Sequence, residues 1–191
     1  MKILEERIKK DGLILNDDIL KVDSFLNHQV DPTLMMQIGE EFAKLFADTK
    51  ADRILTVESS GIAPAVMTGY AMKLPVVFAR KHKSLTLPDN VYTADVYSFT
   101  KQVNNQIIID KRFLHPDENV LIIDDFLANG QAVQGLLNIA KDAGANIEGV
   151  GIVIEKTFQR GRKLLEEHNI RIEALARIAE FKNGEVIFTE D

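Results

Sequence analysis

The sequence predicts an α/β fold in which a central, mostly parallel β-sheet is flanked by helices. Three observations indicate this class. The apolar runs of strand length lack the polar alternation of half-exposed strands, which is typical of parallel sheets covered on both faces. Most of these runs are followed by a segment whose apolar residues have helical spacing. Polar residues stand where the runs end, and parallel sheets bind ligands at the carboxyl ends of their strands.

Residues 1–35 are predicted to form a small cap in front of the sheet. The charged segment 2–11 is predicted to be a short helix that ends at Gly12. Residues 13–27 contain short strand-like fragments broken by polar residues, and they predict a small hairpin or an irregular segment.

Beyond the cap, helices and strands are predicted in alternation. The first helix starts at Asp31 and Pro32, because aspartate caps free helical N–H groups and proline suits the first helical position, and it continues through about Ala47. The further predicted strands are residues 53–58, 75–81, 107–110, 120–124 and 147–156, with closing edge strands at 171–181 and 185–190. The further predicted helices are residues 59–74 after an initial loop, 130–145, closed by Gly144, and 159–169.

Length and composition limit the classes of function. A chain of 191 residues predicts one domain with a substantial core, and a net charge of −6 disfavours non-specific binding to nucleic acid or to anionic lipid. The absence of cysteine excludes disulfides, thiolate metal sites and cysteine nucleophiles. The first residues lack the apolar core of a signal peptide, and no stretch approaches the length of a membrane span. We therefore expect a cytoplasmic protein with neither a nucleic-acid nor a membrane partner.

Polar residues at the strand ends are the candidate site. They are Glu58, Ser59, Ser60 and Gly61, then Arg80 and Lys81, then Asp124 and Asp125, and finally Glu155 and Lys156. Because the carboxyl ends of parallel strands meet at one edge of a sheet, these groups are expected to lie together. Two adjacent carboxylates suit the vicinal hydroxyls of a sugar, and their charge also suits a developing cation.

The loop after the two aspartates is a candidate phosphate site. It consists of Ala128, Asn129, Gly130, Gln131 and Ala132, with a helix expected to begin near Asn129 or Gly130. A glycine there lets the backbone approach a ligand closely, and the first N–H groups of a helix favour an anion. The same residues also fit a strand end with solvated aspartates and an asparagine N-cap.

Other phosphate-binding folds fit less well. A receiver domain also carries paired aspartates, but it has them near the N-terminus of a shorter chain. The Walker motif G-x-x-x-x-G-K-[ST] is absent, and no G-x-G-x-x-G follows a predicted strand.

The segment "VLIIDDFLANGQA" resembles the signature with which type I phosphoribosyltransferases bind phosphoribosyl pyrophosphate. The segments "DDILKVDSFLNHQVDP", "VESSGIAPA", "ARKHKSLTL", "VYTADVYSFTK" and "GIVIEKTFQRGR" extend the resemblance over nearly the whole chain, toward the branch of that family that uses xanthine. One departure concerns Asn129 and Ala132, which stand where most members have hydroxyl side chains. Main-chain N–H groups and the amides of Asn129 and Gln131 must therefore contribute more to anion binding.

The resemblance implies the family fold, with a small hood formed by both ends of the chain, and a reaction that joins N9 of xanthine to the phosphorylated ribose. In that reading Asp124 and Asp125 are the catalytic pair that holds the ribose, and residues 128–132 hold the 5′-phosphate. Residues 58–61 form the pyrophosphate loop, and Arg80 and Lys81 supply positive charge, part of it to a neighbouring subunit of a homodimer. Mg²⁺ is expected to bind mainly through the pyrophosphate and the ribose, without a metal cage in the protein.

A long polar segment, Ser84–Asn105, follows the second predicted strand and has little apolar periodicity. A loop of about twenty residues is uncommon in a compact domain unless it has a function. By resemblance this segment is the flexible loop that closes over the pyrophosphate and excludes water.

The resemblance assigns the purine to Lys156, Leu20, Asn27 and Phe126, with Phe158 a further candidate to cover the ring. Lysine can only donate hydrogen bonds, so Lys156 suits an oxo group and disfavours adenine. Xanthine, hypoxanthine and guanine all remain possible bases. No histidine is assigned as a general base, because the ring proton of a dioxopurine is acidic enough for positioning to suffice.

A non-catalytic regulator that senses phosphoribosyl pyrophosphate is the alternative function. The repressor branch of the family carries a DNA-binding helical domain ahead of the fold. Here one short helix precedes the cap and the charge balance is acidic, which favours an enzyme of purine salvage.

Overall fold

The computed structural model describes residues 1–16, 19–81, 90–98 and 103–189, and for residues 98, 103 and 104 it describes the backbone alone. Its main feature is a six-stranded sheet in the order β10-β9-β8-β7-β3-β4. The strands are β3 (Arg53–Val57), β4 (Val76–Ala79), β7 (Asn119–Leu127), β8 (Asn146–Lys156), β9 (Ile172–Lys182) and β10 (Glu185–Phe188). All neighbours are parallel except β9 and β10, so the predicted mostly parallel sheet is confirmed.

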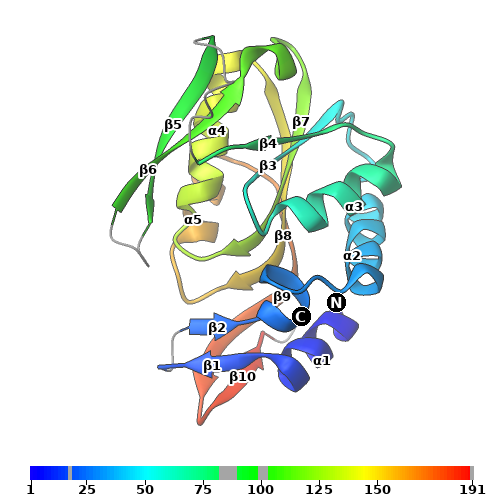
Figure 1. Cartoon of the computed structure of the whole chain (residues 1–191), viewed down its shortest axis with the longest axis vertical. Coiled ribbons are helices and arrows are strands. Elements are labelled where there is room, and N and C mark those ends of the chain that lie inside the picture. The colour runs from blue at the N-terminus through cyan, green and yellow to red at the C-terminus, as the bar shows by residue number, and fades with distance from the viewer. Residues whose placement is uncertain (17–18, 82–89, 99–102, 190–191) are drawn as a thin grey trace.

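Helices cover both faces of this sheet, as Figure 1 shows. α2 (Pro32–Leu45) and α3 (Ile62–Met72) pack against each other, and α4 (Gln131–Ala143) covers the opposite face, with α5 (Gly161–Glu166) following β8. Leu121 and Ile123 of β7 belong to the core beneath α2, whereas Val120 and Ile122 belong to the core beneath α4. Because both faces of β7 are buried, its sequence has no polar alternation.

Both ends of the described chain form the hood at the lower end of Figure 1. It contains α1 (Lys2–Asp11), the hairpin of β1 (Leu13–Leu15) and β2 (Ile19–Lys21), and a π-helix at Asp23–Asn27. α1 contacts β9 and β10, which lie at the other end of the sequence. The predicted helix 2–11 and the predicted hairpin are confirmed.

A second hairpin stands beside α4, and its strands include half of the residues 84–105 that were predicted to be a loop. It pairs β5 (Val91–Ser98) with β6 (Val103–Asp110), and a 3₁₀ turn follows at Lys111–Phe113. The hairpin approaches α4 closely at Gly135, where an added Cβ would lie 2.6 Å from Cγ2 of Val96. Residues 84–89 and 99–102 of the predicted loop lie outside the described residues.

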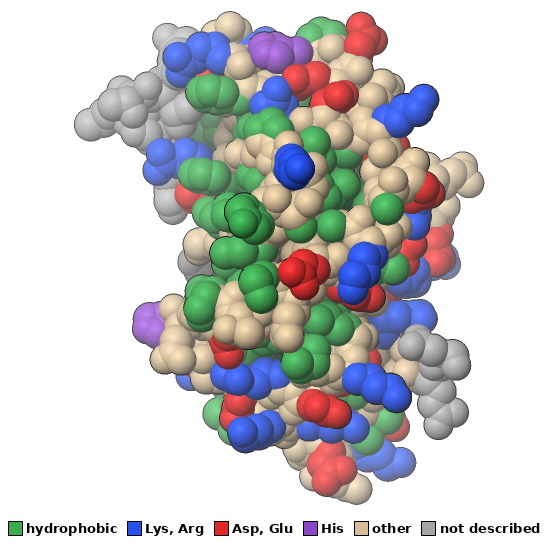
Figure 2. Space-filling model, turned by 90° about the vertical axis from the view of Figure 1, so that its right-hand side faces the viewer, with side chains coloured by type: hydrophobic (Ala, Val, Ile, Leu, Met, Phe, Trp, Pro, Cys, Tyr) green, Lys and Arg blue, Asp and Glu red, His purple; other side chains and the backbone are tan. Residues whose placement is uncertain are grey.

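The face formed by α2, α3 and the edge strand β4 exposes hydrophobic side chains. Met36 and Val66 are each 44% exposed, Phe78 is 41% exposed and Tyr70 is 79% exposed. Figure 2 shows hydrophobic side chains gathered over the side of the molecule on which α2 and α3 lie. None of the described helices is both long enough and apolar enough to cross a bilayer.

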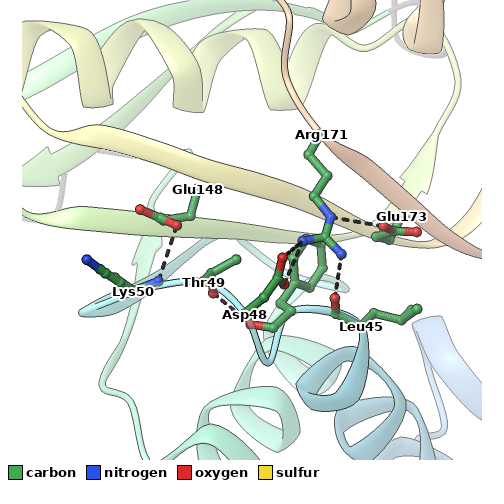
Figure 3. Close-up of polar contacts among 8 residues, drawn as sticks. Leu45, Asp48, Thr49, Lys50, Glu148, Arg171 and Glu173 are labelled. Carbon is green, nitrogen blue, oxygen red and sulfur yellow. Dashed lines mark hydrogen bonds and ion pairs between the residues drawn. The ribbon is translucent and has the colours of Figure 1, made fainter.

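At the amino-terminal edge of the sheet, Arg171 joins α2 to β9 (Figure 3). Its guanidinium donates to both oxygens of Asp48, at 2.7 and 3.0 Å, and to Oε1 of Glu173, at 3.0 Å. It also donates to the carbonyl of Leu45 at 2.6 Å, which satisfies an acceptor in the last turn of α2.

Candidate active site

The two adjacent aspartates lie inside β7 and not beyond its end. The sequence predicted a strand over 120–124, but β7 continues to Leu127 because pairing with β8 continues past the acids. Asp124 is 2% exposed, and its Oδ1 accepts the main-chain N–H of Asp125 at 3.0 Å. Asp125 is partly buried. Asp124 is therefore not a solvated strand-end acid.

The surroundings of these carboxyls raise their affinity for protons. Burial raises the pKa of Asp124 well above its ordinary value, and the negative charge of Asp125 adds to this effect. Burial likewise raises the pKa of Asp125. The charge of Lys81 acts in the opposite direction on both groups, although no described arginine or lysine forms an ion pair with either. Such a pair of desolvated acids is typical of a functional site.

The loop after β7 leads directly into α4. Gly130 has a φ of +79°, in the left-handed region that favours glycine, and it caps α4, which begins at Gln131. The first N–H to bond back within the helix is that of Gln134, which donates to the carbonyl of Gly130 at 2.8 Å. The N–H groups of residues 131–133 precede that bond, so they are available to an anion. Gly161 holds the other side of the loop by donating to the carbonyl of Ala128 at 2.9 Å.

The turn between β3 and α3 lies beside the acid pair. It contains Ser59, Ser60 and Gly61, and the Glu58–Ser59 peptide bond is cis. A Cβ added to Gly61 would lie 2.8 Å from Oδ1 of Asp124, so this position has room for glycine alone. The structure thus brings the turn and the acids of β7 together at one edge of the sheet.

Glu58 connects this turn to the end of β4. Its Oε1 accepts the main-chain N–H of Lys81 at 2.6 Å, and its Oε2 lies 3.8 Å from Nε of Arg80. Arg80 also exchanges two main-chain bonds of 2.9 Å with Ile108 of β6. The side chains of Arg80 and Lys81 are exposed, whereas the carboxylate of Glu58 is already engaged by the protein.

Lys156 lies at the carboxyl end of β8, beside aromatic residues of the hood. Its Nζ is 5.6 Å from the ring centroid of Phe181 on β9, within the range of a cation–π interaction. Phe158 packs edge-on against the same ring at 5.7 Å and is 46% exposed, while Phe126 packs against the core. Sequence reasoning missed Phe181, because only the pairing of β8 with β9 brings it to Lys156.

The remaining two predicted base-binding residues lie in the hood. Leu20 is 6% exposed and belongs to the core with Val22 and Phe25. Asn27 is exposed at the end of the π-helix. Leu20 therefore stabilises the hood whether or not its side chain also meets a ligand.

Known proteins resemble this chain in both sequence and fold. No protein-family model matches it. It is 71% identical to the xanthine phosphoribosyltransferase of Leuconostoc mesenteroides over 188 residues, which span 98% of this chain and 100% of that protein. It is 65% identical to the xanthine phosphoribosyltransferase of Latilactobacillus sakei, over 100% of this chain and 98% of that protein. The chain belongs to the xanthine phosphoribosyltransferase family. The resemblance inferred from its motifs is confirmed.

The fold of this family member is that of the type I phosphoribosyltransferases. An adenine phosphoribosyltransferase from Rhodothermus marinus superposes on it with a TM-score of 0.74, covering 93% of this chain and 100% of that chain. The two share 21% sequence identity, a level at which the likeness bears on the fold alone. The predicted fold class is confirmed.

The site of this family member contains a buried ion pair that the sequence did not reveal. Glu155, next to Lys156, is fully buried, and Arg162 donates to both of its oxygens, at 2.6 and 2.7 Å. Nε of Arg177 on β9 lies 3.4 Å from the same carboxylate. The sequence showed the glutamate at a strand end, but its two partners depend on the placement of α5 and on the strand order.

The carboxylates at this edge of the sheet do not form a metal cage among the described residues. Within the described ranges, no three histidine, aspartate or glutamate side chains are grouped as metal ligands. The hard carboxylate oxygens of Asp124 and Asp125 are compatible with Mg²⁺, which usually keeps several water or substrate ligands. The residues present therefore fit a magnesium ion whose other ligands come from a substrate.

Proposed function

We propose that this chain transfers the 5-phosphoribosyl group of phosphoribosyl pyrophosphate to N9 of xanthine. The products are xanthosine 5′-monophosphate and pyrophosphate, a reaction of purine salvage. The observation that carries the proposal is the meeting of the acids of β7, the free N–H groups at the start of α4 and the β3–α3 turn at one edge of the sheet. The enzymes at 71% and 65% identity have names that support xanthine as the base.

In this mechanism the acid pair acts on the ribose. The N–H groups of residues 131–133 bind the 5′-phosphate, which brings the 2′- and 3′-hydroxyls toward Asp124 and Asp125. Hydrogen bonds from those hydroxyls would satisfy carboxylates that lack a cationic partner among the described residues. As the bond from C1 to pyrophosphate lengthens, positive charge develops on the sugar, and the nearby negative charge stabilises it.

The pyrophosphate is proposed to bind against the turn Ser59–Gly61, with charge from Arg80 and Lys81. Glu58 contributes by fixing the ends of β3 and β4, as its bond to the N–H of Lys81 indicates. Magnesium, held mainly by oxygens of the pyrophosphate and the ribose, would neutralise the charge of the leaving group. Residues 84–105 are proposed to close over this end of the site and to exclude water.

The purine is proposed to lie between the end of β8 and the hood, which makes residues 1–35 the base-binding part of a single domain over 1–191. Lys156 would donate to an exocyclic oxygen, and Asn27 would donate to the second oxygen and accept from a ring N–H. Leu20 and Phe126 would contact the ring. The contact of Lys156 with Phe181 supports a fixed direction for the ammonium.

A homodimer is the proposed assembly. The exposed hydrophobic face of α2, α3 and β4, with Tyr70 79% exposed, supports it, because a surface patch of this kind marks a protein contact. Arg80 follows β4 and would then reach the partner's site. The cytoplasmic location stays a prediction from the sequence.

A comparison of three purines tests the proposal. With Mg²⁺ and phosphoribosyl pyrophosphate present, kcat/KM is measured separately for xanthine, hypoxanthine and guanine, with adenine as the disfavoured control. We expect the highest value for xanthine. A higher value for hypoxanthine or guanine would change the assigned substrate, and binding of phosphoribosyl pyrophosphate without turnover of any purine would favour the regulator.

A further inference from the structure

The buried carboxylate of Glu155 fixes the first turn of α5. Arg162 bonds it through Nε at 2.6 Å and through Nη2 at 2.7 Å, and this two-point contact holds the guanidinium in one orientation. A buried carboxylate without such partners would be strongly destabilising, so the contact persists as long as Glu155 stays buried. Because Arg162 is the second residue of α5, the start of that helix is fixed with it.

The start of α5 in turn contacts the phosphate loop, residues 128–132. The N–H of Gly161 donates to the carbonyl of Ala128 at 2.9 Å. A Cβ added to Gly130 would lie 3.1 Å from Cα of Gly161, and a Cβ added to Gly161 would lie 2.6 Å from the carbonyl oxygen of Ala128. The two segments therefore touch main chain to main chain, and a shift of α5 would move the loop.

The strand register brings the ion pair to the base of this loop. Glu155 of β8 pairs with Leu127, the last residue of β7 before the loop, and on its other side with Arg177 of β9. The carboxylate therefore has two arginine neighbours with different positions. Arg162 lies on α5, which contacts the loop, whereas Arg177 lies on β9, which is separated from β7 by β8.

We propose that Arg162, held by Glu155, is a positioning residue for the 5′-phosphate. It fixes α5 against the phosphate loop, so that the N–H groups at the start of α4 already point at the phosphate position before the substrate arrives. Such preorganisation lowers the loss of entropy on binding. The inference rests on the proposed function, because it assumes that this loop holds the phosphate of a phosphoribosyl substrate.

The test compares Arg162→Leu with Arg177→Leu, which also removes a cationic neighbour of Glu155 but does not touch the loop. Calorimetry gives the dissociation constant of ribose 5-phosphate, and kinetics give KM for phosphoribosyl pyrophosphate and for xanthine. Arg162→Leu is expected to raise the dissociation constant and the KM of phosphoribosyl pyrophosphate about tenfold or more, and the KM of xanthine less. Arg177→Leu is expected to leave all three within about twofold.

Equal increases in both variants, or no increase in Arg162→Leu, would overturn the proposal. If circular dichroism shows Arg162→Leu unfolded, Arg162→Lys replaces it, since it keeps the charge but loses the two-point contact, and the same difference from Arg177→Leu is expected. Wild-type protein that binds ribose 5-phosphate without using xanthine would refute the proposed function. The calorimetric comparison of the two variants would then still test the role of Arg162. Wild-type protein that uses xanthine but does not bind ribose 5-phosphate would refute the proposed role of Arg162 alone, and wild-type protein that does neither would refute both.

Discussion

At the amino-terminal edge of the sheet Glu118 accepts two hydrogen bonds from Arg53, of 2.6 and 3.1 Å, whereas at the carboxyl-terminal edge Asp124 is buried with no cationic partner among the described residues. Burial alone would raise the pKa of Glu118, but the bonds from Arg53 and from the N–H of His115 lower it. At Asp124 burial prevails, and the pKa is raised well above its ordinary value.

The opposite pKa shifts distinguish acids that stabilise the fold from acids that are available to a ligand. An acid whose charged form is hydrogen-bonded adds stability at neutral pH, and an acid that is desolvated without a partner subtracts it. The amino-terminal edge holds acids of the first kind, including Asp48, whose pKa is lowered by the hydrogen bonds of Arg171. The aspartates of β7 are of the second kind, as expected for groups that await the hydroxyls of a substrate.

The largest expected effect concerns Asp125→Asn, which keeps the shape of the side chain and removes its charge. We expect kcat to fall about a hundredfold or more, because charge that stabilises the transition state is lost. The Tm should not fall at neutral pH and should rise slightly, since burial raises the pKa of Asp125 and the neutral amide removes that cost. The measurements are kcat and Tm of the same preparation; a folded variant with a normal rate would contradict the proposed role.

A smaller effect is expected for Lys156→Ala. Loss of a hydrogen bond from a charged donor should reduce kcat/KM for xanthine about tenfold to a hundredfold. The KM for phosphoribosyl pyrophosphate should change much less, because Lys156 lies at the end of β8, next to Phe181, and is not part of the loop 128–132. If the KM for phosphoribosyl pyrophosphate rose by the same factor by which kcat/KM for xanthine fell, the variant would have disturbed the whole edge of the sheet.

Stability should depend on pH with opposite signs at the two edges. The pKa of Asp124 is raised from 3.8, so the wild-type protein loses stability as pH rises above that value, and Asp124→Asn should gain in Tm over wild type from pH 4 toward pH 8. The pKa of Glu118 is lowered from 4.5, so its contribution is present above that value and is lost as pH falls through the folded pKa. The Tm of Glu118→Gln should therefore fall furthest below that of the wild type at neutral pH. Calorimetry from well below pH 4.5 up to neutral pH measures both differences in Tm, and curves with the same pH dependence for the two variants would refute the contrast.

Arg171→Ala should have the smallest effect. Asp48 is exposed and Glu173 is partly exposed, and ion pairs at the surface contribute little, so we expect Tm to fall by at most about 4 °C. Activity should stay at the wild-type level, because Arg171 precedes β9 at the amino-terminal edge of the sheet, whereas Asp124 lies toward the carboxyl end of β7. A loss of activity without a loss of Tm would show that the two edges are coupled.

Much of the fold could be predicted from the sequence, since local pattern determines it. The lack of alternation in β7 indicated burial on both faces, and Asp31, Gly130 and Gly144 indicated the helix boundaries to within a residue or two. The end of β7 was misjudged, because apolar character stops at Asp124 while backbone pairing with β8 continues to Leu127.

Strand β5 and the first residues of β6 were missed for a related reason. The apolar run Ile107–Ile109 was predicted as a strand, but in β5 the inward side chains of Tyr92, Ala94 and Val96 alternate with outward ones and give no continuous apolar run. The partners of site residues were missed because they depend on strand order. Arg162, Arg177 and Phe181 reach Glu155 and Lys156 only once β7, β8 and β9 lie side by side.

The packing of α1 on β9 and β10 has a consequence for how the protein forms in the cell. Leu20 and the π-helix that follows it emerge early from the ribosome, yet the strands against which α1 packs are translated last. Helix α1 cannot complete its packing, and Leu4 and Ile8 stay exposed to solvent or to a chaperone, until translation is nearly complete. The region proposed to recognise the purine would thus be the final part of the enzyme to mature.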